Sequence, residues 1–133
     1  MIVLDTHVLV WADTDDRKLG RKARASIDRL WKTGRVAVAA ISFWEVGLLQ
    51  ARRRLALPVS VREWRDAVLA AGAIELPLDG TIALRALDLS GLHDDPADRF
   101  IVATALVHGA ALMTADDRLL DWRHPLDRLD ARE

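Results

Sequence analysis

Short apolar runs alternate along this chain with segments whose apolar residues recur every three or four positions. Uninterrupted runs are typical of strands buried on both faces, whereas the longer spacing is typical of amphipathic helices. The runs predict strands at residues 1–4, 36–41, 73–78 and 110–114, with a last edge strand at 126–129. The third of these is interrupted late by Pro77, which a central strand would not tolerate.

Helices are predicted between the strands, most of them with a recognisable start or stop. The segment after residues 1–4 turns into helix at Asp5 and Thr6, and Pro96 sits where proline favours the first position of a helix. The spacing predicts helices over 19–32, from 42 to a stop at Pro58, and over 60–71, 79–89, 96–108 and 116–122, with a loop at 90–95. Alternating strands and helices favour a single α/β domain over residues 1–133, with a mainly parallel central sheet flanked by helices.

Composition excludes several classes of protein. The 133 residues suit one ordinary domain, and 51% of them are hydrophobic. The absence of cysteine removes disulfides, thiolate zinc sites and cysteine nucleophiles. There is no signal-peptide pattern and no apolar run near the ~20 residues that span a bilayer, so we expect a cytoplasmic protein without membrane contact. The net charge of −1 gives no bulk basic excess for binding nucleic acid.

Acidic residues follow three of the predicted strands. Asp5, Glu45 and Asp116 each come shortly after a strand, and Asp98 lies in the first turn of the helix that Pro96 begins. In an open parallel sheet the carboxyl ends of the strands face one edge, where ligands bind. We therefore expect the four carboxylates to meet there.

Four neighbouring carboxylates need a counter-charge. Like charges at ~4 Å repel by several kcal/mol near a protein surface, and a divalent cation is the simplest way to offset that repulsion. Oxygen ligands select Mg²⁺, with Mn²⁺ as a substitute, over zinc. A site of this kind can hydrolyse a phosphodiester, because the metal polarises the phosphoryl group and lowers the pKa of its bound water.

A purely structural interpretation also fits most of these acids. Residues 42–45 (SFWE) match a capping box, and Asp95, Asp98 and Asp116 match acids that begin helices. Only Asp5 has no comparable structural need at the end of a buried strand. The metal-site hypothesis therefore depends on the whole set.

Four segments resemble the motifs of PIN domains, especially those of VapC-type toxins. In chain order they are MIVLDTHVLVW, AAISFWEVGLL, DPADRFIVATAL and LMTADDRL, and together they span Met1 to about Leu120. The resemblance implies a parallel sheet between helices and metal-dependent endoribonuclease activity. It also implies a catalytic metal site at Asp5, Glu45, Asp98 and Asp116, with Asp5 and Asp98 as direct ligands. In such proteins the positions of Thr6, Ser42 and Thr114 support the site by hydrogen bonds.

The resemblance implies partners as well. VapC-type toxins cleave RNA, pair with an antitoxin whose C-terminal segment fills a groove of the toxin, and usually form homodimers. The apolar surface around Trp11, Trp44, Leu48 and Leu49 is the candidate docking face, although each of these residues taken alone is more typical of the hydrophobic core.

Basic side chains near the predicted site are candidates for RNA contacts. Arg52 and Arg53, in the run RRR that Arg54 completes, could bind phosphates, although a short charge run is more often a solvated helix face. Arg99 follows a candidate ligand and could contact a phosphate or lock a neighbouring acid.

The histidines show no metal-ligand spacing and are interpreted as incidental, with His7 nearest the site; the other three are His93, His108 and His124. No nucleophile elbow and no glycine-rich phosphate loop occurs, which disfavours hydrolase triads and nucleotide triphosphatases.

The sequence is also compatible with three other functions. The first is a housekeeping PIN ribonuclease without an antitoxin. The second is a receiver domain, which would need a lysine after a late strand, yet the only lysines are Lys18, Lys22 and Lys32. The third is a non-catalytic binding module whose acids only cap helices.

Overall fold

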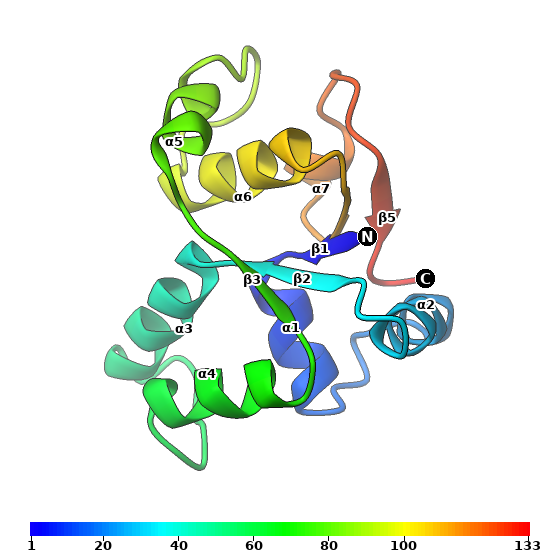
Figure 1. The fold of residues 1–133 in the computed structure, drawn as a ribbon, viewed down its shortest axis with the longest axis vertical. Coiled ribbons are helices and arrows are strands. Elements are labelled where there is room, and N and C mark those ends of the chain that lie inside the picture. The colour runs from blue at the N-terminus through cyan, green and yellow to red at the C-terminus, as the bar shows by residue number, and fades with distance from the viewer.

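Five parallel strands form the central sheet in the computed structural model, which describes all of residues 1–133 (Figure 1). The strands are β1 (Ile2–Leu4), β2 (Val36–Ala39), β3 (Ile74–Leu76), β4 (Ala111–Thr114) and β5 (Arg128–Asp130). Their order across the sheet is β3-β2-β1-β4-β5, and every neighbouring pair is parallel. The predicted α/β class with a mainly parallel sheet is confirmed.

Helices cover both faces of the sheet. They are α1 (Thr6–Asp13), α2 (Arg21–Trp31), α3 (Ile41–Ala51), α4 (Val61–Ala70), α5 (Gly80–Leu87), α6 (Pro96–Val107) and α7 (Asp117–Leu120). Helices α1 to α4 lie on one face of the sheet and α5 to α7 on the other (Figure 1), and the side chains of each group pack in a separate core.

Side chains of the central strands alternate between two separate hydrophobic cores. On β1, Ile2 and Leu4 belong to the core beneath α1 to α4, whereas Val3 belongs to the core beneath α5 to α7. Burial on both faces explains why β1, β2 and β4 are continuous apolar runs in the sequence.

The strand register brings the ends of the central strands to one level. Leu4, the last residue of β1, pairs with Val38 of β2 and with Met113 of β4. The chain leaves β1 and β4 within a residue of those pairs and enters the helices that follow them. This edge is where the acidic residues were expected.

The turn into helix predicted at Asp5 and Thr6 is confirmed, since the structure has a complete helix there, α1, with Val8 and Leu9 fully buried. One local prediction was wrong. The predicted capping box at 42–45 does not form, because α3 already begins at Ile41 and Ala40 precedes it without a side-chain cap. Ser42 therefore lies inside the first turn of α3.

No helix of the structure combines the length and the apolar character that crossing a bilayer requires.

Candidate metal centre

Acidic side chains from three elements line one groove at the carboxyl edge of the sheet. Asp5 follows β1, Glu45 lies on α3 and Asp98 lies on α6, and all three border a cavity of about 380 Å³. Asp5 is 3% exposed and Asp98 is 8% exposed, so both carboxylates lie almost out of solvent. Burial of this kind is costly for a charged group without a partner.

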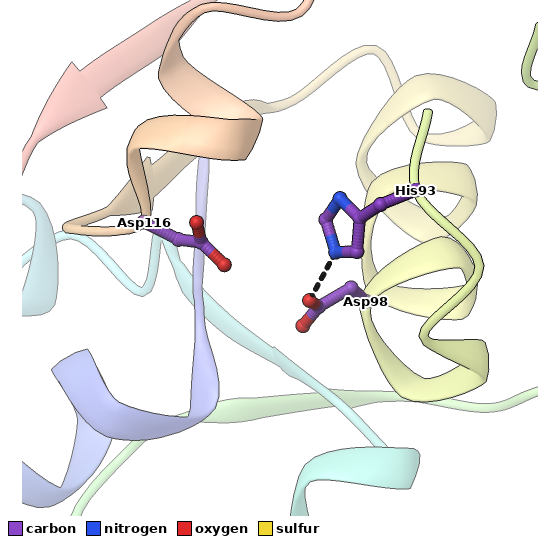
Figure 2. A group of neighbouring side chains, drawn as sticks. All are labelled: His93, Asp98 and Asp116. Atoms are coloured by element: carbon purple, nitrogen blue, oxygen red, sulfur yellow. Dashed lines mark hydrogen bonds and ion pairs between the residues drawn. The ribbon is translucent and has the colours of Figure 1, made fainter. Parts of the chain in front are cut away.

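Asp98 and Asp116 form a cluster with His93, a residue of the loop before α6 (Figure 2). His93 Nε2 lies 2.6 Å from Asp98 Oδ2, and one ligand atom of each of the three residues lies within 4.8 Å of the others. The sequence-based view of His93 as incidental was wrong. Its only signal in the sequence is its position five residues before Asp98, in an acidic loop.

The start of α6 fixes the Asp98 side of this cluster. Asp95 caps the helix, since its Oδ1 accepts hydrogen bonds from the backbone N–H groups of Ala97 and Asp98. Asp95 was expected to be a cap, and this is confirmed. Asp98 is thus free of the capping role and turns its carboxylate toward His93.

Asp5 is held through both of its carboxylate oxygens. Its Oδ1 accepts a hydrogen bond from the N–H of Thr6 at 2.9 Å, and its Oδ2 accepts one from Thr114 Oγ1 at 2.7 Å. Thr114 Oγ1 in turn accepts from the N–H of Asp116 at 3.0 Å, which links the ends of β1 and β4. Asp5 also precedes α1 as its N-cap, so the expectation that it has no structural role was wrong.

Two hydroxyls connect Glu45 to the same network. Thr6 Oγ1 lies 2.5 Å from Glu45 Oε1 and 2.9 Å from Ser42 Oγ. A threonine hydroxyl carries one proton, so Thr6 donates to the carboxylate and accepts from Ser42. Ser42 is fully buried, and its hydroxyl serves this contact rather than a helix cap.

The groove has an excess of negative charge. The pKa of Glu45 is raised to about 7, mainly by burial and also by the nearby charges of Asp5 and Asp98, which together outweigh the hydrogen bond from Thr6. Burial likewise raises the pKa of Asp98, although the contact with His93 partly offsets this effect. Both shifts mean that the ionised carboxylates are under-compensated by the protein's own groups.

The fold that carries this site also occurs in known proteins. Residues 2–124 match the PIN domain family. This chain belongs to the PIN-domain family. It is also 36% identical over 125 residues to the protein named Ribonuclease VapC22 of Mycobacterium tuberculosis, a match that covers 93% of each chain. The VapC-type resemblance seen in the sequence is therefore confirmed.

Solved structures show the same fold at low sequence identity. The VapBC2 structure from Rickettsia felis, bound to a promoter DNA fragment, matches with a TM-score of 0.71 at 15% identity, over 97% of this chain and 98% of that one. The DNA-bound VapBC structure from Salmonella typhimurium matches with a TM-score of 0.70 at 15% identity, over 97% and 96% of the two chains.

A further histidine borders the acids of this PIN domain. His7 Nε2 accepts a hydrogen bond from the N–H of Ala115 at 3.1 Å, and its Nδ1 lies 3.7 Å from Asp5 Oδ2. His7 therefore ties the end of β4 to α1 beside Asp5. His108 and His124 contact none of the four acids.

The basic residues are placed differently from the prediction. Arg52 and Arg53 are exposed and do not border the groove, whereas Arg54 and Lys18 do. Arg99 donates to the backbone carbonyls of Ala86, Leu89, Leu92 and His93. Arg99 does not lock a neighbouring acid, because its guanidinium instead holds the loop that carries His93.

The basic side chain that does reach the acids is Arg118, which was not predicted. Its guanidinium pairs with Asp116 at 2.9 Å and approaches Asp98 Oδ2 at 3.6 Å. The pairing lowers the pKa of Asp116. Asp117, the neighbouring acid, points away from the groove and pairs with Arg132.

Proposed function

We propose that this PIN domain, over residues 1–133, is a divalent-metal-dependent endoribonuclease and the toxin of a type II toxin–antitoxin pair. The observation that carries the proposal is the convergence of Asp5, Glu45 and Asp98 on one groove, with Asp116 clustered beside Asp98 and His93 and joined to Asp98 through Arg118. A sequence relative over nearly the whole chain is named a ribonuclease, which supports the same activity.

The residues of the groove fit Mg²⁺ or Mn²⁺. The donor set is four carboxylates and one imidazole, without sulfur, which suits hard cations and excludes the thiolate sites of structural zinc. The raised pKa values of Glu45 and Asp98 indicate negative charge that a cation would compensate. Asp5, Asp98 and Asp116 would hold the metal, and Glu45 would complete the set.

A bound divalent cation would supply a polarised phosphoryl group and an acidified water for hydrolysis. The protein's own groups do the positioning. Thr114 fixes Asp5 relative to Asp116, and Thr6 fixes Glu45 through its Oε1. Glu45 Oε2 makes no hydrogen bond within the protein, so this oxygen is free to accept a proton in the groove. We assign Thr6, Ser42 and Thr114 to this supporting role.

Digestion of total RNA tests the activity. The wild-type protein should produce new RNA ends in Mg²⁺ or Mn²⁺ and none in EDTA, and sequencing these ends would identify the bond that is cut. Asp98→Asn should remove the cleavage, whereas Asp130→Asn, an acid outside the groove, should not. Cleavage that persists in EDTA, or in Asp98→Asn, would overturn the metal-dependent mechanism.

The antitoxin partner is supported by the neighbours among solved structures. One of them, at 19% identity and a TM-score of 0.66 over 98% of each chain, is described as a toxin–antitoxin complex from Klebsiella pneumoniae. The predicted docking face is not core, since Trp44 is 58% exposed and Trp11, Leu48 and Leu49 are partly exposed.

An adjacent small reading frame encoding a DNA-binding protein would distinguish the toxin from a housekeeping PIN ribonuclease. Its product, when added, should inhibit RNA cleavage. Homodimerisation stays a prediction, which light scattering of the purified chain would test.

A further inference from the structure

Arg118 is the basic side chain that compensates two acids of the candidate metal centre, Asp116 and Asp98. Its Nε and one terminal nitrogen contact the two oxygens of Asp116 at 3.2 and 2.9 Å. The same terminal nitrogen lies 3.6 Å from Asp98 Oδ2. One guanidinium therefore reaches two of the carboxylates assigned to the metal.

A metal ion and Arg118 compete for the same carboxylate oxygens of Asp98 and Asp116. Carboxylate lone pairs given to a divalent cation are no longer available to a guanidinium, and the two positive charges repel each other. Binding of the metal should therefore weaken the hold of Asp98 and Asp116 on Arg118. The side chain of Arg118 is 60% exposed, so it can turn without disturbing the core.

Charge balance indicates where the released guanidinium goes. The carboxylates of Asp5, Glu45, Asp98 and Asp116, when ionised, carry more negative charge than one divalent cation offsets, so Arg118 stays attracted to the site after the metal has bound. A phosphodiester brings one further negative charge and two free oxygens, which match the planar fork of an arginine. We propose that Arg118 binds a backbone phosphate of the RNA substrate once a divalent cation has taken the carboxylates of Asp98 and Asp116.

Other basic residues do not serve this position. The guanidinium of Arg99 is committed to backbone carbonyls through all three of its nitrogens. Lys18 and Arg54 border the groove but pair with neither Asp98 nor Asp116. Arg118 alone combines contact with these two acids and exposure to solvent.

The proposal rests on the proposed nuclease function, and its first test measures metal binding without RNA. Calorimetric titration with Mn²⁺ should show that Arg118→Gln binds the ion about 3- to 5-fold more tightly than wild type, because a competing cation at a solvent-exposed ion pair has been removed. Arg132→Gln is the matched control, since Arg132 makes the same contacts to Asp130 away from the groove. Equal affinities in the two variants would overturn the competition between Arg118 and the metal.

The second test measures cleavage of a labelled single-stranded RNA that contains one site found by sequencing. At saturating Mn²⁺, Arg118→Gln should raise KM by about 10-fold or more and change kcat much less, because one charge-assisted hydrogen-bonding group to the phosphate is lost. Arg118→Lys keeps the charge and should recover part of the loss. A KM equal to that of Arg132→Gln would overturn the phosphate contact.

The two proposals fail in different ways. If wild type binds Mn²⁺ but cuts no RNA, the nuclease function falls, and the assignment of Arg118 to an RNA phosphate falls with it. If wild type cuts RNA and Arg118→Gln behaves like Arg132→Gln in both tests, only the role of Arg118 is overturned.

Discussion

Two turns of this molecule have almost the same local structure and very different surroundings. Asp116 and Arg118 follow β4, while Asp130 and Arg132 lie at the end of β5. In both turns the backbone N–H of the arginine donates to Oδ1 of the aspartate at 2.9 Å. A terminal nitrogen of the arginine guanidinium donates to Oδ2 of the same aspartate, also at 2.9 Å. The two carboxylates are also similarly exposed, at 20% and 24%, and the paired arginine lowers the pKa of each.

The difference lies in what surrounds each pair. Arg118 also reaches Asp98, a buried acid whose pKa is raised, whereas Arg132 also reaches Asp117, whose side chain is 67% exposed. An aspartate–arginine turn is thus a common local solution that indicates no function by itself. The turn with Asp116 and Arg118 differs because buried carboxylates lie beside it, at the edge where the parallel strands end.

Replacing either aspartate alone by asparagine should give the largest difference in RNA cleavage between the two turns. Asn replaces Asp well as a local cap, so both variants should fold with similar stability. Asp116→Asn should lower metal-dependent RNA cleavage by about 100-fold or more, because it removes a carboxylate assigned to the metal. Asp130→Asn should retain wild-type cleavage, as measured by initial rates on one RNA substrate.

An equal loss of activity in the two variants would contradict the distinction between the turns. It would mean that both aspartates act only through the local structure they share.

Thr114→Val should destabilise the protein more than the loss of a threonine hydroxyl inside a helix does. Thr114 donates to the buried Asp5 and accepts from the N–H of the partly buried Asp116, and valine removes both hydrogen bonds. Because Asp5 and Thr114 are buried, we expect a loss of about 1–3 kcal/mol in the free energy of unfolding, mostly from the Asp5 contact, measured by urea denaturation.

The control for that prediction is Thr104→Val. Thr104 Oγ1 donates to Phe100 O, one helical turn earlier in α6. Without the Thr104 hydroxyl, the carbonyl of Phe100 keeps its backbone hydrogen bond in the helix. The free energy of unfolding should therefore fall less, by no more than about 1 kcal/mol. A Thr114→Val variant as stable as Thr104→Val would contradict the link between β1 and β4.

The sequence could predict which acids share an edge but not how they are connected. Alternating strands and helices place Asp5, Glu45 and Asp116 after parallel strands, and a right-handed crossover brings Asp98 to the same side. His93 and Arg118 could not be found in this way. Arg99 fastens the loop between α5 and α6 that carries His93 to Asp98, and these contacts leave no pattern in the sequence.

Helix starts were the other point at which sequence reasoning failed. Residues 42–45 have the letters of a capping box, yet tertiary contacts with Thr6 outweigh that local preference and leave Ser42 inside α3. Conversely, Asp5 carries two roles at once, as a cap of α1 and as a groove acid. A residue that begins a helix can therefore still belong to a site.

The stability of the protein without metal should show an unusual dependence on pH. The pKa of Glu45 is about 7 in the folded protein, against 4.5 for an unperturbed glutamate, so the folded state holds this proton more tightly. The resulting stabilisation is fully present below pH 4.5 and is lost as pH rises through 7. In EDTA, thermal melts of wild type should fall more steeply over this range than those of Glu45→Gln.

The opposite contribution of Asp130 is confined to lower pH, because its pKa is lowered and its stabilisation is lost only in acid. If Tm falls equally with pH for wild type and Glu45→Gln from pH 4.5 to above 7, the pKa of Glu45 is not raised in the folded protein.

Thermal melting with and without Mn²⁺ tests most directly the claim that the converged acids form a cation site. At about 100-fold excess over Kd, a ligand that binds only the folded state adds ~2.7 kcal/mol, which raises Tm by roughly 8 °C in a chain of this size. Wild type and Asp130→Asn should both show this rise, and Asp98→Asn should lose most of it. No rise in wild type, or an equal rise in Asp98→Asn, would contradict the assignment of these acids to a metal.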